Sequence, residues 1–160
     1  MREILFKAKR IDNGEWVEGF YFCMVHEDGR HVHHFIMPIG VDVNLGTPIE
    51  KIQVEIDIDT LCQYTGLEAY WTAFENEPQE CDVWEHDLLE VDYEGKKVIA
   101  NVKYEGGMFI LASNEFIDSY IPLFNVVQIE DDYWIDAEHI GNIFDNPELL
   151  EGGADDGKES

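Results

Sequence analysis

The chain has 160 residues, of which 45% are hydrophobic and 12% aromatic, fractions that are typical of a folded protein. A chain of this length forms one domain or two very small ones, and it can bury a core without a metal ion or a disulfide. The 35 acidic and 10 basic residues give a net charge of −25, which argues against direct binding to nucleic acid or to an anionic membrane. The charge is compatible with a basic protein partner, and it also favours solubility.

The three cysteines, Cys23, Cys62 and Cys81, are too far apart in the sequence for any pair to form a metal-ligand motif. We expect them to be reduced thiols. The N-terminal residues lack the apolar run of a signal peptide, and no stretch approaches the roughly 18 apolar residues of a membrane span. We therefore expect a soluble protein of the cytoplasm.

The N-terminal region predicts two successive β-hairpins. Residues 2–11 alternate between apolar and polar side chains, and Asn13-Gly14 is a strong signal for a tight turn. With a two-residue loop, Lys9 would face Glu18 on the next strand, which is a favourable cross-strand charge pair.

The second hairpin would gather histidines on one face. A turn at Asp28-Gly29 sets His26 opposite His31, with His33 close by. Three imidazoles around a common point could hold zinc, and this set is our candidate for a metal-dependent hydrolase. The same face carries three phenylalanines, so the alternative is a group of partly exposed histidines near the hairpin tip. These phenylalanines are Phe20, Phe22 and Phe35.

The following residues alternate between loop and regular structure. Residues 38–48 are rich in Gly, Asn and Pro and predict a loop, whereas 49–58 alternate as a strand with an acidic, solvated outer face. A short helical turn follows, with Asp59 as its N-cap and Gly66 just after its end. Residues 68–81 are less regular and predict a linker.

The clearest pattern lies between residues 82 and 112. Strands are predicted over 88–93, 96–104 and 108–112, because apolar side chains recur at every second position. Tight turns are expected at Glu94-Gly95 and at 105–107, where glycine accepts a positive φ at no steric cost.

Asp87 stands at the entrance to the first of these strands. We expect its carboxylate to accept backbone N–H groups of the turn in preference to acting in catalysis. No catalytic motif occurs here or elsewhere in the sequence. We therefore expect no enzyme, no catalytic residue and no cofactor.

The C-terminal part predicts one loop, two strands and a final helical turn. Residues 114–122 are expected to form a loop or helical turn, and 124–129 and 133–143 to form strands. In 146–150, Asn-Pro-Glu-Leu-Leu predicts a last helical turn with Asn as its N-cap. Residues 151–160 are expected to be disordered.

Three segments stand out together: 1–8 (MREILFKA), 63–67 (QYTGL) and 140–150 (IGNIFDNPELL). In this order and spacing they resemble the YopX family of phage and prophage proteins. The last is the most specific, and the resemblance spans about residues 1 to 150. It implies an SH3-like small β-barrel and a gene carried by a phage or prophage in a bacterial host. It implies no established activity, so no functional residue is carried over.

The sequence departs from the family pattern at the entrance to the central strands. The family usually has glycine where this chain has His86. If that glycine adopts a positive φ, His86 must do the same, at a cost of roughly 1 kcal/mol.

The predicted fold is mostly β. We expect an antiparallel meander over 1–60, a helical turn and linker over 61–81, an SH3-like barrel and final turn over 82–150, and a disordered acidic tail over 151–160.

The first functional hypothesis is a non-enzymatic accessory protein in the cytoplasm of the bacterial host, which binds another protein of host or phage; the negative charge is compatible with a basic partner. A second is an acidic mimic of DNA that occupies a host DNA-binding protein. A third is a metal-dependent hydrolase that uses His26, His31 and His33. Exposed strand edges and tryptophans would also permit self-association into a homo-oligomer. These tryptophans are Trp71, Trp84 and Trp134.

Overall fold

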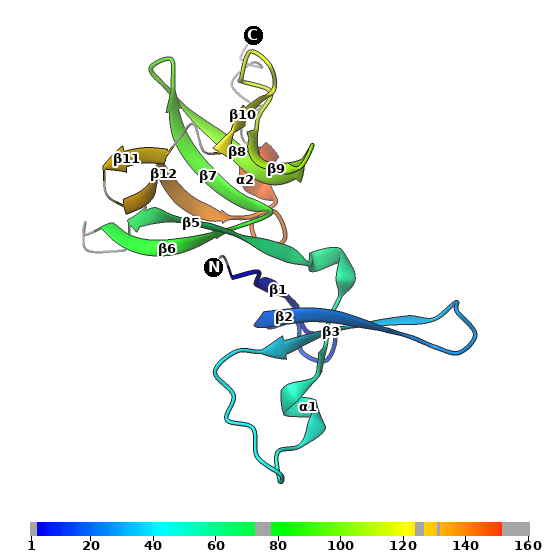
Figure 1. Ribbon diagram of the computed structural model, residues 1–160. Helices are drawn as coiled ribbons and strands as arrows, with labels where there is room; N and C mark the ends of the chain where they lie inside the picture. Colours follow the sequence, from blue (N-terminus) through cyan, green and yellow to red (C-terminus); the bar gives the residue numbers. More distant parts are fainter. Residues whose placement is uncertain (1–2, 73–77, 124–126, 131, 152–160) are drawn as a thin grey trace. The chain divides into compact units, whose positions relative to one another are not determined.

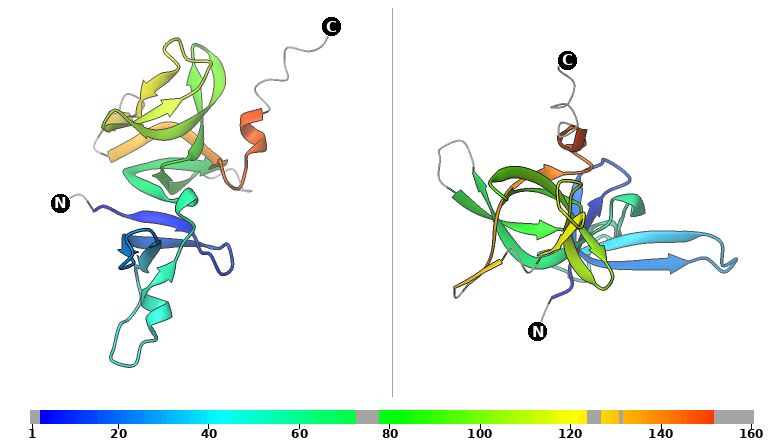
Figure 2. Two further views of the ribbon diagram at one scale, coloured as in Figure 1. Left: turned by 90° about the vertical axis from the view of Figure 1, so that its right-hand side faces the viewer. Right: turned by 90° about the horizontal axis from the view of Figure 1, so that it is seen from above.

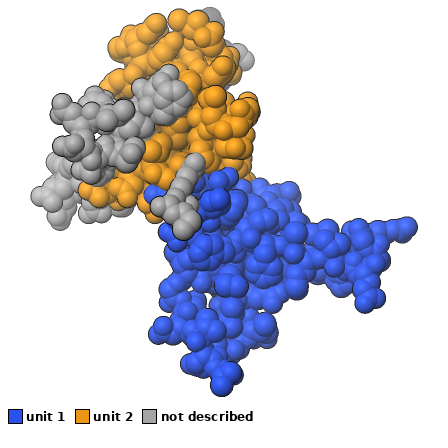
Figure 3. Space-filling model, viewed as in Figure 1, with its two compact units in different colours: residues 1–64 blue, residues 65–160 orange. Residues whose placement is uncertain are grey.

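The computed structural model describes residues 3–72, 78–123, 127–130 and 132–151 (Figure 1). The protein is mostly β, with 55% of its residues in strands and 10% in helices, as the sequence predicts. The strands form two antiparallel sheets, and none of the described strands closes into a barrel, so the SH3-like barrel is not confirmed. The chain divides into two compact units, unit 1 (residues 1–64) and unit 2 (residues 65–160) (Figure 3).

Unit 1 is a small antiparallel sheet with two short helical turns. Its strands lie in the order in which they occur: β1 (Phe6–Lys9), β2 (Trp16–Val25), β3 (Val32–Pro38) and β4 (Val54–Glu55). The helical turns are α1 (Ile49–Ile52) and η1 (Ile58–Thr60), and β5 (Cys62–Thr72) begins in this unit. The buried centre of unit 1 consists of Ala8, Ile36 and Ile56.

The register of the first hairpin differs from the prediction. Lys9 faces Trp16, and Glu18 faces Lys7, two residues from the expected position. The loop is longer than two residues, since the Arg10 N–H donates to the Glu15 carbonyl at 2.9 Å. The Asn13 side chain accepts the Glu15 N–H at 2.9 Å, and this local bond favours the longer loop.

The second hairpin has the predicted register. Met24 faces His33, and the His26 N–H donates to the His31 carbonyl at 2.9 Å. We call residues 16–38, which form β2, β3 and their turn, the ribbon. Figures 1 and 2 show β2 and β3 continuing as a two-stranded arm beyond the end of β1.

Two predictions between residues 49 and 81 are wrong. The expected strand over 49–58 is the helical turn α1 followed by the two-residue β4. The expected helical turn and linker over 61–81 contain β5 and β6 (Pro78–Trp84). Cys62 in β5 pairs with Lys7 in β1, and pairing with a strand distant in the sequence overrides the local helical signals.

Unit 2 contains the second sheet. Its remaining strands are β7 (Asp87–Tyr93), β8 (Lys96–Glu105), β9 (Met108–Ala112), β10 (Tyr120–Pro122), β11 (Val127–Glu130) and β12 (Asp132–Asn142), and α2 (Glu148–Glu151) follows. The order across the sheet is β10-β9-β8-β7-β12, with β11 paired to β12 and β6 to β5. A short parallel contact joins β12 to β5.

The three central strands, β7 to β9, confirm the prediction from the sequence. The Glu94-Gly95 turn has positive φ values of 50° and 80°, and the Gly106-Gly107 turn has 60° and 84°. Positive φ at both central residues is the type I′ geometry that matches the twist of paired strands. The apolar residues of these strands form most of the buried core of unit 2: Leu89, Val91, Val98, Ala100, Val102 and Leu111.

The C-terminal predictions are confirmed in part. Strand β11 begins at Val127, three residues after the start of the strand expected over 124–129. Strand β12 covers most of the strand expected over 133–143, and α2 overlaps the expected final turn. Residues 152–160 of the expected acidic tail lie outside the described residues. In the described part of the chain, no helix is long and apolar enough to cross a membrane.

Candidate functional site

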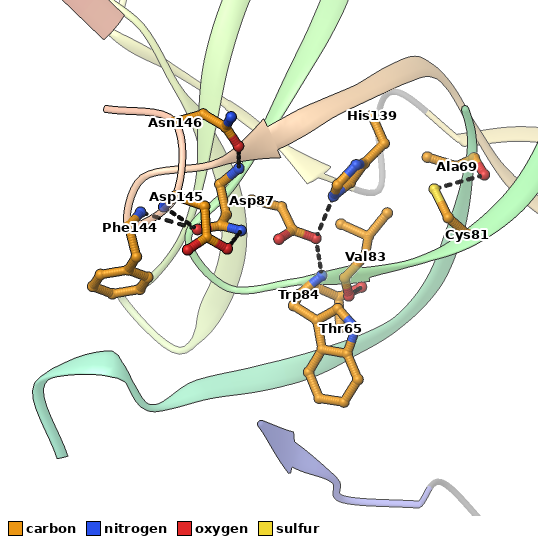
Figure 4. Close-up of polar contacts among 11 residues, drawn as sticks. Thr65, Ala69, Cys81, Val83, Trp84, Asp87, His139, Phe144, Asp145 and Asn146 are labelled. Atoms are coloured by element: carbon orange, nitrogen blue, oxygen red, sulfur yellow. Dashed lines mark hydrogen bonds and ion pairs between the residues drawn. The ribbon is translucent and has the colours of Figure 1, made fainter. Parts of the chain in front are cut away.

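Among the residues of unit 2 whose burial the structure describes, the most deeply buried ionisable side chain is that of Asp87, the first residue of β7, which is 0% exposed. Its Oδ2 accepts the Trp84 N–H at 2.8 Å, which confirms the predicted turn-capping role (Figure 4). The same oxygen lies 3.1 Å from Nε2 of His139 in β12. A buried carboxylate needs such partners, because leaving one without them costs several kcal/mol.

His86, which stands where the family usually has glycine, has the positive φ that we expected. Its φ is 70°, in the left-handed region that side chains other than glycine seldom adopt. Two backbone bonds hold it there: its N–H donates to Val102 at 2.7 Å, and its carbonyl accepts from Ile143 at 3.0 Å. Its ring also packs edge-on against Phe144 at 5.4 Å. The turn is therefore retained with histidine in place of glycine.

The segment 140–150 forms a loop that satisfies its own polar groups (Figure 4). Asn142 Oδ1 accepts the N–H groups of Phe144 at 3.0 Å and Asp145 at 2.9 Å. Asn146 Oδ1 in turn accepts the Asn142 N–H at 3.3 Å. A Cβ atom at Gly141 would lie 2.2 Å from that same Asn146 oxygen, so the loop requires glycine there. These side chains build the loop and do not form a reactive group.

The segment 63–67 has a similar structural role. The Thr65 hydroxyl is buried and donates to the Val83 carbonyl at 2.7 Å, while its oxygen accepts the Leu67 N–H at 3.2 Å. Gly66, with a φ of 80°, provides the left-handed step between them. Two of the three segments that resemble the family therefore have structural explanations.

Cys81 lies near Asp87 but is poorly suited to act as a nucleophile. Its Sγ lies 3.4 Å from the Ala69 carbonyl oxygen. Burial, and then the negative charge of Asp87, raise the pKa of the Cys81 thiol to about 11. The reactive form of cysteine is the thiolate, so this thiol is inert near neutral pH. The site lacks an activated cysteine of the kind that a Cys–His–Asp hydrolase requires.

The sequence predicts Asp87 and its role in the turn, but it does not indicate that His139 and Cys81 lie near this carboxylate. His139 reaches Asp87 only because β12 pairs with β7, far from it in the sequence. No local motif marks that pairing.

The hairpin histidines do come together, as predicted. The ring centroid of His26 lies 6.0 Å from that of His31 and 5.0 Å from that of His33. Two carboxylates hold the Nδ1 atoms: Asp28 bonds His31 at 2.5 Å, and Glu55 bonds His33 at 2.7 Å. Within the described residues, however, no three His, Cys, Asp or Glu side chains are placed to hold a metal ion. The hydrolase hypothesis gains no support from this geometry.

A hollow of about 430 Å³ lies in unit 1, between the first hairpin loop, β3 and β4. Its rim is partly apolar, with Ile11 and Val32 exposed. Its charged Arg10 is already paired with Asp12 at 2.7 Å. Its His34 bonds the Tyr21 hydroxyl at 2.8 Å, and its Glu55 bonds His33 at 2.7 Å. We therefore assign no catalytic pair to this hollow.

Two surface features distinguish the units. Unit 1 exposes large apolar side chains on one face of the ribbon: Phe20 is 46% exposed, Met24 48% and Met37 44%. Unit 2 carries most of the charge. Residues 1–64 contain eleven acidic and six basic residues, a net of −5, and residues 65–160 contain 24 and four, a net of −20.

The chain matches the model of the YopX family, described as YopX protein, over residues 6–151, which is most of its length. No curated protein and no solved structure matches it.

Replacing Asp87 by Ala should lower the free energy of unfolding by about 3 kcal/mol, because it leaves the Trp84 N–H and His139 without their acceptor. Asp87→Asn keeps an acceptor oxygen and should cost about 1 kcal/mol. The matched control is Asp92→Ala, an exposed acid on the same strand, which should change stability by less than about 0.5 kcal/mol. Urea unfolding measures all three. A cost for Asp87→Ala no larger than that of the control would exclude the structural role.

Alkylation of Cys81 should depend on pH in a way that reports the charge of Asp87. In a Cys23→Ala background, the reaction should be slow at neutral pH and accelerate toward about pH 11. Asp87→Asn should move this midpoint to lower pH, since a nearby negative charge disfavours the thiolate. The midpoint should stay above that of an ordinary cysteine, because burial is the larger cause. Rapid alkylation of Cys81 at neutral pH would contradict the assignment.

Proposed function

The chain belongs to the YopX family, and from that premise we propose that it is a non-enzymatic, phage-type module that binds another protein. The observation that carries the proposal is the exposed apolar face of the ribbon. We also propose that it acts in the cytoplasm of a bacterial host, with a partner from host or phage.

The ribbon face has the chemistry of a protein interface. Phe20 and Met37 lie directly opposite each other on β2 and β3, and Met24 follows on the same face. Phe22 and Phe35 stack beside them with ring centroids 5.3 Å apart, which gives the patch a packed base. Aromatic residues and methionine are enriched where proteins bind one another, and methionine adapts to partners of different shape.

The buried polar groups of unit 2 support a binding role over an enzymatic one. Asp87 contacts His139 and accepts the Trp84 N–H of the turn, and the thiol of Cys81 has a raised pKa. The loop at 141–146 uses its polar side chains on its own backbone. These groups stabilise the fold, and the side chains that a partner can contact lie at the surface.

A second candidate function is mimicry of DNA by unit 2. The supporting observation is the charge separation: a net of −20 over residues 65–160 against −5 over residues 1–64. A field of that sign attracts the basic surface of a DNA-binding protein. The two candidates differ in salt dependence, since apolar contacts survive high salt whereas charge contacts weaken with it.

Affinity capture from nuclease-treated host lysate, with and without phage infection, tests both candidates. A partner that binds the ribbon should be recovered by the natural chain at low and high salt. Its recovery should fall at least about tenfold with the double substitution Phe20→Ser and Met37→Ser, because exposed aromatic anchors dominate interface energies.

The matched control for this capture is Ile117→Ser, which removes an 80% exposed apolar side chain in unit 2. It should leave recovery unchanged. A partner lost at high salt, displaced by duplex DNA and indifferent to the ribbon substitutions would reject the ribbon and support mimicry. Recovery of no partner in either lysate would count against both.

A further inference from the structure

One edge of β2 is open. On one side β1 pairs with β2 only from Trp16 to Gly19, whereas on the other side β3 pairs with it from Gly19 to Val25. Beyond Gly19, no strand in the described part of the chain pairs with β2 on the side where β1 lies. The open stretch is residues 20–25.

The hydrogen-bonding direction of each residue in this stretch follows from the ladder. In an antiparallel pair, successive residues direct their N–H and C=O groups to opposite sides. The Glu18 carbonyl accepts from Ile39 and the His26 N–H donates to His31, so even-numbered residues of β2 face β3. Tyr21, Cys23 and Val25 therefore direct their N–H and C=O groups to the open edge.

The open edge lacks the features that usually prevent strand pairing. Natural edge strands are blunted by a charged side chain, a proline or a bulge. Residues 19–26 (GFYFCMVH) contain no proline, aspartate, glutamate, lysine or arginine, although 28% of the whole chain is charged. The register with β3 runs without a bulge from Gly19 to Val25. This edge is thus able to accept another strand.

We propose that the open edge of β2 pairs with the same edge of a second copy, in an antiparallel, two-fold symmetric dimer. Each copy supplies the same backbone N–H and C=O groups. A two-fold axis therefore pairs the donors of each edge with the acceptors of the other, and both copies use the same surface. Because residues 19–26 carry no formal charge, two chains of net charge −25 can approach along this edge with little local repulsion.

The length of the open stretch selects the register. The open stretch together with His26, the residue that follows β2, overlaps most fully when Cys23 lies opposite Cys23 of the second copy. Tyr21 then lies opposite Val25, and their backbone groups form the hydrogen bonds of the ladder. Phe22 lies opposite Met24, which places a thioether against an aromatic ring, a favourable contact.

The dimer does not depend on the partner protein of the proposed function, so it can be tested with the purified chain alone. Loss of a partner in the capture experiment and loss of the dimer are separate readouts. Either can occur without the other.

Sedimentation velocity of the full chain, from micromolar to near-millimolar concentration, tests the dimer. The dimer fraction should rise with concentration and also with salt, because salt screens the repulsion between the copies. A monomer at every concentration and salt would overturn the proposal.

A pair of substitutions tests the edge. Val25→Lys places a charge on the open edge and should weaken the dimer at least about tenfold. Val32→Lys is the matched control: Val32 lies directly opposite Val25 on β3, and the two are 43% and 59% exposed. It makes the same change in charge away from the β2 edge and should alter the dimer constant by less than about twofold. Equal effects of the two variants would also overturn the proposal, and thermal melts confirm that both are folded.

Cross-linking tests the register. Cys23 is exposed, Cys62 is buried, and the Cys81 thiol has a pKa of about 11, so a maleimide at neutral pH reacts at Cys23. Cβ atoms directly opposite each other across paired strands lie about 5 Å apart, within reach of a short bis-maleimide. The natural chain and Val32→Lys should give a cross-linked dimer, Val25→Lys much less, and Cys23→Ala none. A dimer in sedimentation that does not cross-link at Cys23 would reject this pairing.

Discussion

The bond from the Trp84 N–H to the buried carboxylate of Asp87 is the interaction on which the architecture of unit 2 depends. It closes the turn that leads from β6 into β7, in which His86 has its left-handed conformation. The same carboxylate faces His139 in β12, and the His86 carbonyl accepts the Ile143 N–H. The turn that Asp87 caps is therefore connected both to β12, through the carboxylate, and to the loop after β12, through the His86 carbonyl.

This arrangement explains why a cluster with the appearance of a catalytic site has a structural role. Aspartate, histidine and cysteine lie close together, but burial and the charge of Asp87 keep the thiol of Cys81 protonated at neutral pH. The residues that offer contacts to other molecules lie elsewhere, on the apolar face of the ribbon and in the acidic residues of unit 2. The function we propose is therefore binding.

The sequence predicted those parts of the fold that local chemistry determines. Alternating apolar residues and the glycine turns at 94–95 and 106–107 defined β7 to β9, because period-two burial and positive φ are properties of short segments. The conformation of His86 and the capping role of Asp87 followed from single positions in a turn. The sequence thus predicted the turn that contains Asp87 and His86, which is one half of the site.

The other half depends on partners far apart in the sequence. His139 meets Asp87 through strand pairing, which no local pattern encodes. Strand β5 forms where a helical turn was expected, because β1 offers it a partner. The first hairpin shifted by two residues because one side-chain bond, from Asn13 to the Glu15 N–H, stabilises a longer loop.

Hydrogen exchange of Asp87→Asn against the natural chain tests the central claim most directly. If the carboxylate of Asp87 couples the turn, β12 and the loop, the amides of Trp84 and Ile143 should both exchange about fivefold faster, since a loss of about 1 kcal/mol opens the whole assembly by that factor. The amide of His26 in the ribbon should keep its rate. Unchanged protection at Trp84 and Ile143 would contradict the account.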